Sequence, residues 1–185
     1  MTQLIRLATV NDAPEVLNVT LRAYEPIREL NINFLAATAD SQLVTNNIRR
    51  NLTYVLEEEG QIVSTVTVRH PWNDPDHFSP YPFIWWFAVD PLYKQKGFGS
   101  TLLTYVEENI LRKQVKAPAV YLATAERHPW LVSIYERRGY EIFAERDHDG
   151  EKIVYLRKIL DETLYRIIES KEPIISNYKC SGELR

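Results

Sequence analysis

The sequence predicts a mixed α/β fold in one domain, and three observations support this prediction. The 185 residues are enough for a single domain with a sizeable buried core. Hydrophobic residues make up 45% of the chain and charged residues 25%, a globular composition that excludes a wholly disordered protein. Segments with helical periodicity alternate with β-rich runs, so helices and strands are expected to pack around a common core.

The first half of the chain is predicted to contain three strands and two helices. β-branched and aromatic runs mark the strands, and apolar residues three or four positions apart mark the helices. In order, these elements are a strand over 4–8, a helix after Asn11, a helix over 40–51, and strands over 53–58 and 62–68. Asn11 and either Asp40 or Ser41 suit the N-terminal caps of the two helices. The mixed pattern of residues 25–37 predicts a partly irregular segment.

The second half is predicted to add two strands, two helices and a hairpin after a proline-rich loop over 71–82. The strand over 83–89 is apolar without alternation, as expected for burial on both faces. The other elements are a helix over 99–110, a strand over 119–124, a helix from His128-Pro129 to Gly139, and a hairpin of 140–145 with 152–159. The order βααβββαβαββ describes a domain over residues 1–160.

Residues 161–185 lie outside this pattern and are predicted to form a C-terminal helical extension. Leu164, Ile167 and Ile168 share one face of an amphipathic helix, and the final residues are expected to be weakly ordered. The helix could pack on its own domain or on a second copy, so a homodimer is one expectation.

The charge and cysteine content exclude several classes of protein. With 25 acidic and 22 basic residues the formal net charge is −3, which argues against bulk attraction to nucleic acid or an anionic membrane. No apolar run approaches the ~18–20 residues that span a bilayer, and the N-terminus lacks the apolar segment of a signal peptide. Cys180 has no partner for a disulfide or a Cys-rich zinc site. We therefore expect a cytoplasmic protein without a metal site.

Residues 89–101 carry the most informative motif, a loop with Lys94, Lys96, Gly97 and Gly99 between a buried strand and a helix. The free N–H groups at a helix N-terminus bind anions, and glycines let a phosphate approach the backbone. The third glycine of a Rossmann fingerprint and the lysine of a P-loop are both missing. Taken alone, the two glycines fit a plain strand-to-helix turn.

In its context, the segment resembles the acyl-CoA-binding motif of the GNAT superfamily of N-acyltransferases, commonly written Gln/Arg-x-x-Gly-x-Gly/Ala. The sequence Val-Asp-Pro precedes the motif at the end of a buried strand, and Lys94 occupies the Gln/Arg position. Lys94 keeps the positive charge of arginine but lacks its forked guanidinium.

A second segment is similar to the same family. Residues 128–140 read His-Pro-Trp-Leu-Val-Ser-Ile-Tyr-Glu-Arg-Arg-Gly-Tyr, against the family's Asn-x-x-Ala-x-x-x-Tyr-Glu-x-x-Gly-Phe. Tyr135 and Gly139 match, whereas His128 replaces the Asn and Leu131 replaces the Ala. Histidine can still donate a hydrogen bond at that position. The resemblance covers most of the chain and excludes the tail.

The resemblance implies a GNAT-type central sheet, mixed but mostly antiparallel, with helices on both faces. In this family the fourth and fifth strands splay apart, and the pantetheine arm of acetyl-CoA lies in the gap like an added strand. The implied cofactor-binding residues are Phe87, Ala88, Val89, Lys94, Gln95, Lys96, Gly97, Phe98, Gly99, Ser100, Thr101, His128 and Ser133. The first three would offer backbone groups to pantetheine, and the loop and helix start would hold the pyrophosphate.

The resemblance also implies that Tyr135 is the catalytic acid. A phenol with a pKa of ~10 can protonate a departing thiolate, whose aqueous pKa is ~8.5. The backbone N–H of Val89 would stabilise charge on the carbonyl oxygen. Judged alone, Tyr135 is more simply a packing residue. The base that deprotonates the amine stays open between His70, Glu25, Glu29 and a chain of water.

The function hypothesis is therefore an N-acetyltransferase that moves an acetyl group from acetyl-CoA to a primary amine of a small molecule or peptide. The alternative is a non-catalytic acyl-CoA-binding or regulatory module, and a nucleotide-binding domain is disfavoured by the missing glycine and lysine. Trp85 and Trp86 are adjacent on one strand and are expected to point to opposite faces. No residue identifies the acceptor.

Overall fold

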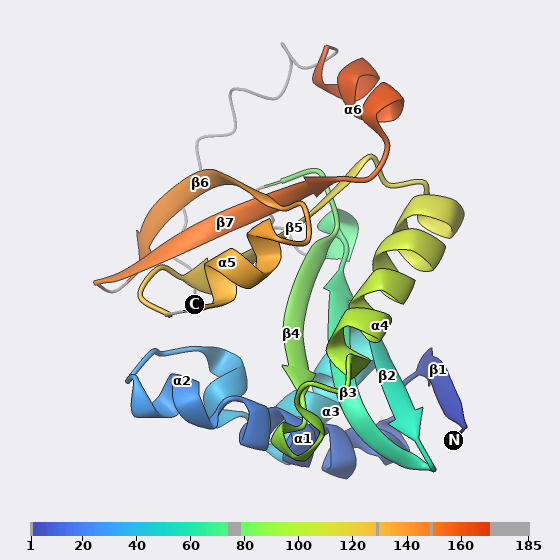
Figure 1. Ribbon diagram of the computed structural model, residues 1–185, viewed down its shortest axis with the longest axis vertical. Helices are drawn as coiled ribbons and strands as arrows, with labels where there is room; N and C mark the ends of the chain where they lie inside the picture. The colour runs from blue at the N-terminus through green and yellow to red at the C-terminus, as the bar shows by residue number, and fades with distance from the viewer. Residues whose placement is uncertain (1, 74–78, 129, 149, 171–185) are drawn as a thin grey trace.

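The structure is a computed structural model that describes residues 2–73, 79–128, 130–148 and 150–170. Seven strands form one sheet in the order β1-β2-β3-β4-β5-β7-β6 (Figure 1). The strands are β1 (Gln3–Leu7), β2 (Leu52–Glu58), β3 (Gln61–Arg69), β4 (Phe83–Val89), β5 (Ala119–Ala125), β6 (Glu141–His148) and β7 (Glu151–Ile159). The helices are α1 (Ala13–Ala23), α2 (Glu25–Glu29), α3 (Ser41–Arg50), α4 (Phe98–Tyr105), α5 (Leu131–Glu136) and α6 (Glu162–Glu169).

The predicted fold class is confirmed, and several local predictions hold in detail. Strand β4 has the predicted bounds, and the segment over 25–37 combines the short helix α2 with a 3₁₀ turn over Leu35–Thr38. Asp40 caps α3, because its side chain accepts a 2.7 Å hydrogen bond from the backbone N–H of Leu43.

Three helix boundaries differ from the prediction. Helix α1 begins at Ala13, after a 3₁₀ turn over Val10–Asp12, so Asn11 is not its cap. Helix α4 is continued by a π-helix over Val106–Val115, beyond the predicted end. Helix α5 begins at Leu131 rather than at His128. The apolar periodicity located each helix, but the turns that precede and follow it depend on contacts outside the helix.

Strands β4 and β5 are parallel and pair over a short stretch only. The residue pairs Phe83↔Tyr121 and Ile84↔Leu122 join the start of β4 to the middle of β5. The other neighbouring strands of the sheet are antiparallel, and every residue of β5 pairs with a residue of β7. After Ile84 the strands β4 and β5 separate, which leaves the C-terminal half of β4 with an open edge.

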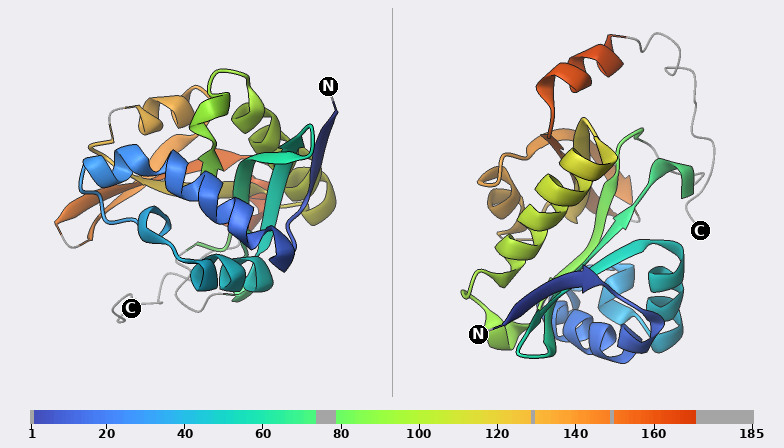
Figure 2. Two further views of the ribbon diagram at one scale, coloured as in Figure 1. Left: turned by 90° about the horizontal axis from the view of Figure 1, so that it is seen from below. Right: turned by 90° about the vertical axis from the view of Figure 1, so that its right-hand side faces the viewer.

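Helices cover both faces of the sheet (Figure 2). On one face α1 and α3 bury Val16 and Val44 in a cluster that includes Trp86. On the other face α4 and α5 bury Leu102 and Tyr135 in a second cluster. None of the helices in the described ranges combines the length and apolar character needed to cross a membrane.

A β-bulge in β4 changes which side its side chains face. Thr65 of β3 pairs with Ala88, but Thr67 pairs with Trp85, so β4 holds one extra residue at this point. Trp86 adopts a left-handed backbone conformation with φ of 48°. The rings of Trp85 and Trp86 therefore lie together with centroids 4.7 Å apart, and both belong to the α1–α3 side. The expectation that they point to opposite faces is wrong, because regular alternation fails at a bulge.

The two glycines at the start of α4 have different structural roles. Gly97 is the N-cap residue with φ of 81°, a conformation that favours glycine. Gly99 lies against β4, where an added Cβ would stand 2.6 Å from Cγ2 of Val89 and 3.1 Å from Cζ of Phe87. Gly99 thus allows the first turn of α4 to lie directly on β4.

The predicted C-terminal helix forms as α6 and docks on its own chain. The rings of Tyr165 and Tyr81 have centroids 5.7 Å apart, and the hydroxyl of Tyr81 donates a 2.7 Å hydrogen bond to Glu169. The guanidinium of Arg157 lies 5.0 Å from the centre of the Tyr165 ring. The rest of the predicted tail, over 171–185, lies outside the described residues.

Replacing Gly99 with alanine is expected to destabilise the protein. Overpacking of this kind lowers the free energy of unfolding by about 1–3 kcal/mol. The better helix propensity of alanine offsets at most about 1 kcal/mol of this loss. Urea denaturation followed by circular dichroism measures the difference. Thr101→Ala, at an exposed position of the same helix, is the control and should stay within about 0.5 kcal/mol of wild type. Equal stability of Gly99→Ala and wild type would contradict this account of the contact.

Candidate active site

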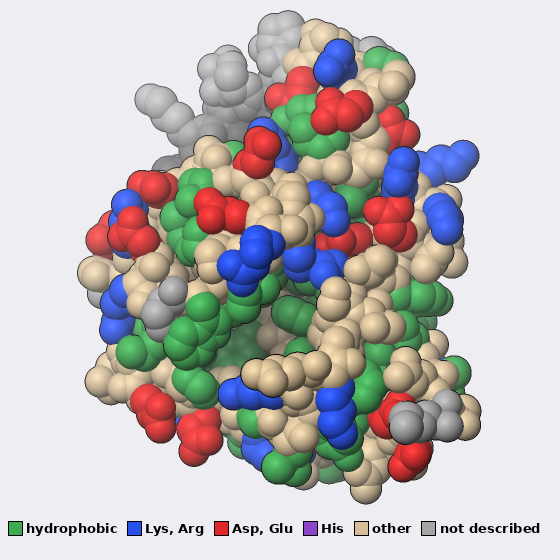
Figure 3. Space-filling view, in the orientation of Figure 1, with side chains coloured by type: hydrophobic (Ala, Val, Ile, Leu, Met, Phe, Trp, Pro, Cys, Tyr) green, Lys and Arg blue, Asp and Glu red, His purple; other side chains and the backbone are tan. Residues whose placement is uncertain are grey.

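A cavity of about 390 Å³ lies where β4 and β5 separate. In Figure 3 it is visible as a hollow with hydrophobic side chains gathered around it. The whole of β4 lines it, together with residues from the end of α1, from α2, from the 3₁₀ turn over Leu35–Thr38, from β5 and from α5. The cavity is thus bounded by elements from both halves of the chain.

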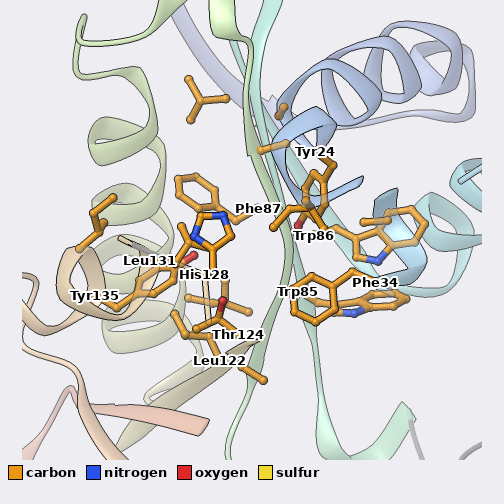
Figure 4. Close-up of a pocket in the computed structure, with 18 of the residues that line it drawn as sticks. Tyr24, Phe34, Trp85, Trp86, Phe87, Leu122, Thr124, His128, Leu131 and Tyr135 are labelled. Atoms are coloured by element: carbon orange, nitrogen blue, oxygen red, sulfur yellow. The ribbon is translucent and has the colours of Figure 1, made fainter. Parts of the chain in front are cut away.

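The two sides of the cavity have different composition. Tyr24, Phe34, Trp85 and Trp86 lie on one side, and we call these four residues the aromatic wall (Figure 4). The opposite side, toward α4 and α5, carries Phe87, His128, Leu131 and Tyr135. Leu122 and Thr124 of β5 lie between the two sides in the same view.

The open edge of β4 presents the backbone of Val89 to the gap. The N–H of Asp90 donates to the carbonyl of Val63 at 2.9 Å, and the carbonyl of Ala88 accepts a 2.9 Å hydrogen bond from the hydroxyl of Ser64. Both groups therefore face β3. Because backbone groups alternate along a strand, the N–H and carbonyl of Val89 face the other edge, from which β5 has separated. The carbonyl of Ala88 is bonded on the β3 side, and its predicted contact with pantetheine stays a prediction.

Tyr135 places a protonated phenol in the cavity. Its side chain is buried, and burial raises its pKa to about 12. The hydroxyl makes no hydrogen bond within the described part of the chain, and in Figure 4 it points toward the ring of His128. Burial, followed by the charge of Tyr135, also raises the pKa of Tyr24 on the opposite side. Both phenols therefore keep their protons at neutral pH.

Three buried polar atoms of the cavity lining lack hydrogen-bond partners among the described residues. They are Nδ1 of His128, Oγ1 of Thr124 and Nε1 of Trp86, on side chains that are 4%, 1% and 5% exposed. Burial lowers the pKa of His128, so its ring is neutral at pH 7. Unpartnered polar atoms are costly in a folded protein unless a ligand or water satisfies them.

A buried ionic cluster holds the helix that carries Tyr135. Glu107, in the π-helix, accepts hydrogen bonds from Tyr140 at 2.8 Å, Lys158 at 2.6 Å and Arg138 at 3.2 Å. Arg138 also donates to the hydroxyl of Ser100 at 2.8 Å. The cluster thus joins the first turn of α4 to the chain just after α5.

The structure brings six of the predicted site residues together around the cavity. They are Phe87, Ala88, Val89, Lys94, His128 and Tyr135. The other predicted residues do not line it and are Gln95, Lys96, Gly97, Phe98, Gly99, Ser100, Thr101 and Ser133. Most of these lie in the loop and first turn of α4, adjacent to Lys94. Among them, Phe98 is buried in the core, and the hydroxyl of Ser133 donates to the carbonyl of Trp130 at 3.1 Å.

The three candidate bases do not line the cavity. Glu25 and Glu29 are exposed, and His70 is stacked on Trp72 with ring centroids 4.3 Å apart. Sequence reasoning missed Phe34 and Thr124 as parts of the site. Thr124 is a polar residue in an otherwise apolar predicted strand, and this departure from the pattern could have identified it. Phe34 lies in an irregular segment, where no local pattern marks it.

The geometry fits an acyl-CoA. The open edge of β4 offers a backbone donor and acceptor to an extended chain, and the N-terminus of α4 lies at the end of that edge. Helix N-termini favour phosphate groups. Lys94, in the loop between the open edge of β4 and the N-terminus of α4, adds a positive charge. His128 and Tyr135 add two polar groups that have no hydrogen-bond partner among the described residues.

Comparison with known proteins identifies the family. Residues 20–140 match the model of the acetyltransferase (GNAT) family. The chain is 49% identical over 158 residues to the S-alkylcysteine N-acetyltransferase of Bacillus subtilis, covering 85% of this chain and 89% of that protein. It is 51% identical over 160 residues to the S-(2-succino)cysteine N-acetyltransferase of the same species, covering 86% and 97%.

Solved structures share the fold at low sequence identity. The PaiA N-acetyltransferase of Thermoplasma acidophilum in complex with coenzyme A aligns with a TM-score of 0.67 and 16% identity over 86% of this chain and 99% of that one. The ribosomal-protein-S18-alanine N-acetyltransferase of Escherichia coli aligns with a TM-score of 0.66 and 18% identity, covering 86% and 95%. Fold, family match and close relatives agree: the chain belongs to the GNAT acetyltransferase family and is an acetyl-CoA-dependent N-acetyltransferase.

Proposed function

We propose that this enzyme acetylates the α-amino group of an S-substituted cysteine. The observation that carries the proposal is an apolar cavity that contains a few buried polar atoms without partners. Such a cavity suits a ligand with an amine and a carboxylate at one end and an apolar group at the other. Two relatives at about half identity along most of the chain are named for acetylation of S-substituted cysteines.

The size of the cavity favours a small molecule over a peptide as acceptor. The whole cavity, which the acceptor would share with the acetyl end of the donor, measures about 390 Å³, at the lower end of the range of small-ligand sites, roughly 300–1,000 Å³. The relatives' acceptors are amino acid derivatives, which such a volume accommodates.

We assign the residues of the open edge and the start of α4 to the acetyl donor. The backbone of Val89 would pair with an extended arm, and Lys94 with the turn over 95–101 would hold phosphate groups. When bound, acetyl-CoA supplies an acetyl group activated as a thioester. The N–H of Val89 is the backbone donor that would stabilise negative charge on an oxygen held in the gap.

Tyr135 is the proposed acid. Its raised pKa keeps the proton on the hydroxyl at neutral pH, and none of the described residues accepts a hydrogen bond from that hydroxyl, so it is available to donate to a ligand. On the acceptor side, the neutral ring of His128 can accept a hydrogen bond from the amine, while the hydroxyl of Thr124 can donate to a carboxylate.

Release of coenzyme A in the presence of S-butylcysteine tests the proposed acceptor. We expect turnover that depends on this compound and a product whose mass corresponds to acetylation at nitrogen. The matched control is 3-(butylthio)propionic acid, which lacks the amine and should release no coenzyme A. Efficient acetylation of spermidine with no turnover of any S-substituted cysteine would refute the proposal.

Replacing Tyr135 with phenylalanine is expected to lower kcat by ~10²–10³, because the general acid is lost. Isothermal titration calorimetry should give an acetyl-CoA affinity close to that of wild type, since the ring is retained. Tyr140→Phe is the matched control: its hydroxyl is bound to Glu107 outside the cavity, so we expect reduced stability with a kcat near wild type. An unchanged kcat in Tyr135→Phe would remove this residue from the mechanism.

A further inference from the structure

We propose that the S-substituent of the acceptor is an uncharged apolar or aromatic group, held against the aromatic wall of Tyr24, Phe34, Trp85 and Trp86. This inference rests on the proposed function, and it adds which kind of S-substituted cysteine the enzyme selects. It is carried by the charge distribution around the cavity and by the chemistry of this wall.

The acceptor side of the cavity is lined without charge. The end of α1, helix α2 and the following 3₁₀ turn contribute only apolar side chains and the phenol of Tyr24, with Phe34 and Leu35 among them. Strand β4 adds both indoles, because the bulge at Trp86 turns Trp85 and Trp86 to the same side. A flexible alkyl or benzyl thioether would find apolar contacts on these surfaces.

Lys94 is the one charged side chain among the described lining residues, and its position assigns it to the other ligand. It follows β4 in the loop that leads to the N-terminus of α4. The aromatic wall lies on the opposite side of the cavity (Figure 4). The described residues of the aromatic wall therefore provide no cation that could pair with a carboxylate on the S-substituent.

Arg22 at the end of α1 pairs with Asp90, and the other arginines on the elements around the wall also make contacts outside the cavity lining. Arg28 of α2 donates to the carbonyls of Ala37 at 2.9 Å and Leu21 at 2.8 Å. Arg127, just after β5, donates to the carbonyls of Leu30 and Asn31 and pairs with Glu151.

Arg69, at the end of β3, has its guanidinium 4.6 Å from the centre of the Trp85 ring and is also outside the lining. Recruiting any of these arginine side chains would require a contact described above to be broken. A succinyl group would bring two carboxylates in addition to the α-carboxylate, and the aromatic wall offers them neither a cation nor the hydroxyl donor that Thr124 offers the α-carboxylate, so their burial is costly.

The mouth of the cavity extends the apolar surface. Leu35 and Trp130 both line the cavity and are 53% and 48% exposed, and they come from opposite halves of the chain. A substituent longer than the wall therefore continues along apolar side chains toward solvent. This arrangement favours larger hydrophobic groups over a methyl group.

The test compares kcat/KM for S-methyl-, S-butyl-, S-benzyl- and S-(2-succino)cysteine with the full-length enzyme and acetyl-CoA. We expect kcat/KM to rise roughly fourfold for each methylene group that becomes buried between S-methyl and S-butyl. S-benzylcysteine should equal or exceed S-butylcysteine. S-(2-succino)cysteine should be at least ~100-fold poorer than S-butylcysteine, because its carboxylates lack partners.

Variants of Phe34 link the preference to the wall. Phe34→Ala should reduce kcat/KM for the butyl and benzyl substrates at least ~10-fold and leave S-methylcysteine within about threefold of wild type. Phe34→Leu, which keeps an apolar side chain, should retain the butyl substrate and lose part of the benzyl preference. Trp72→Ala removes an exposed aromatic residue outside the cavity and should leave all ratios unchanged.

Two results would overturn the inference. Turnover of S-(2-succino)cysteine at least as efficient as that of S-butylcysteine would contradict it while leaving the proposed function intact. Equal losses for all substrates in a folded Phe34→Leu variant would show that the wall does not select the substituent. If no S-substituted cysteine is acetylated but another amine is, both the proposed function and this inference fail.

Discussion

The short pairing between β4 and β5 is the constraint on which the rest of the site depends. Two residue pairs hold the strands together, and beyond Ile84 the edge of β4 has no partner strand. Buried backbone groups need hydrogen bonds, so an extended ligand that pairs with the open edge like an added strand would satisfy them. The same separation creates the cavity and gives the side chains of β5 and α5 access to it. Binding of an extended cofactor arm and access of an acceptor thus have one structural cause.

The cavity combines an apolar lining with a small number of unsatisfied polar atoms, which is a cost to stability that binding can offset. His128, Thr124 and Trp86 each bury a polar atom without a partner in the described chain. The bulge at Trp86 adds a left-handed backbone conformation, which is unusual for a large side chain. These costs lie in residues that line the cavity, while the Glu107 cluster and the helix contact at Gly99 hold the surrounding elements in place.

The sequence predicted the architecture and the cofactor side of the site better than the acceptor side. Strand β4 and the helix after Gly97 have local signals, and the motif around Lys94 pointed to the correct family. The aromatic wall depends on contacts that a local pattern does not encode. Phe34 comes from an irregular segment, and Trp85 and Trp86 share a side only because β3 and β4 shift register at Thr65 and Thr67. The β-period therefore assigned Trp85 and Trp86 to opposite faces.

Amide hydrogen exchange at Val89, followed by NMR with and without coenzyme A, tests the central claim most directly. An amide on the open edge of β4 should exchange quickly in the free protein and become protected when coenzyme A binds. The amide of Asp90, which donates to Val63, is the internal reference and should be protected in both states. Protection of Val89 already in the free protein, or no change on addition of saturating coenzyme A, would contradict the role assigned to the gap.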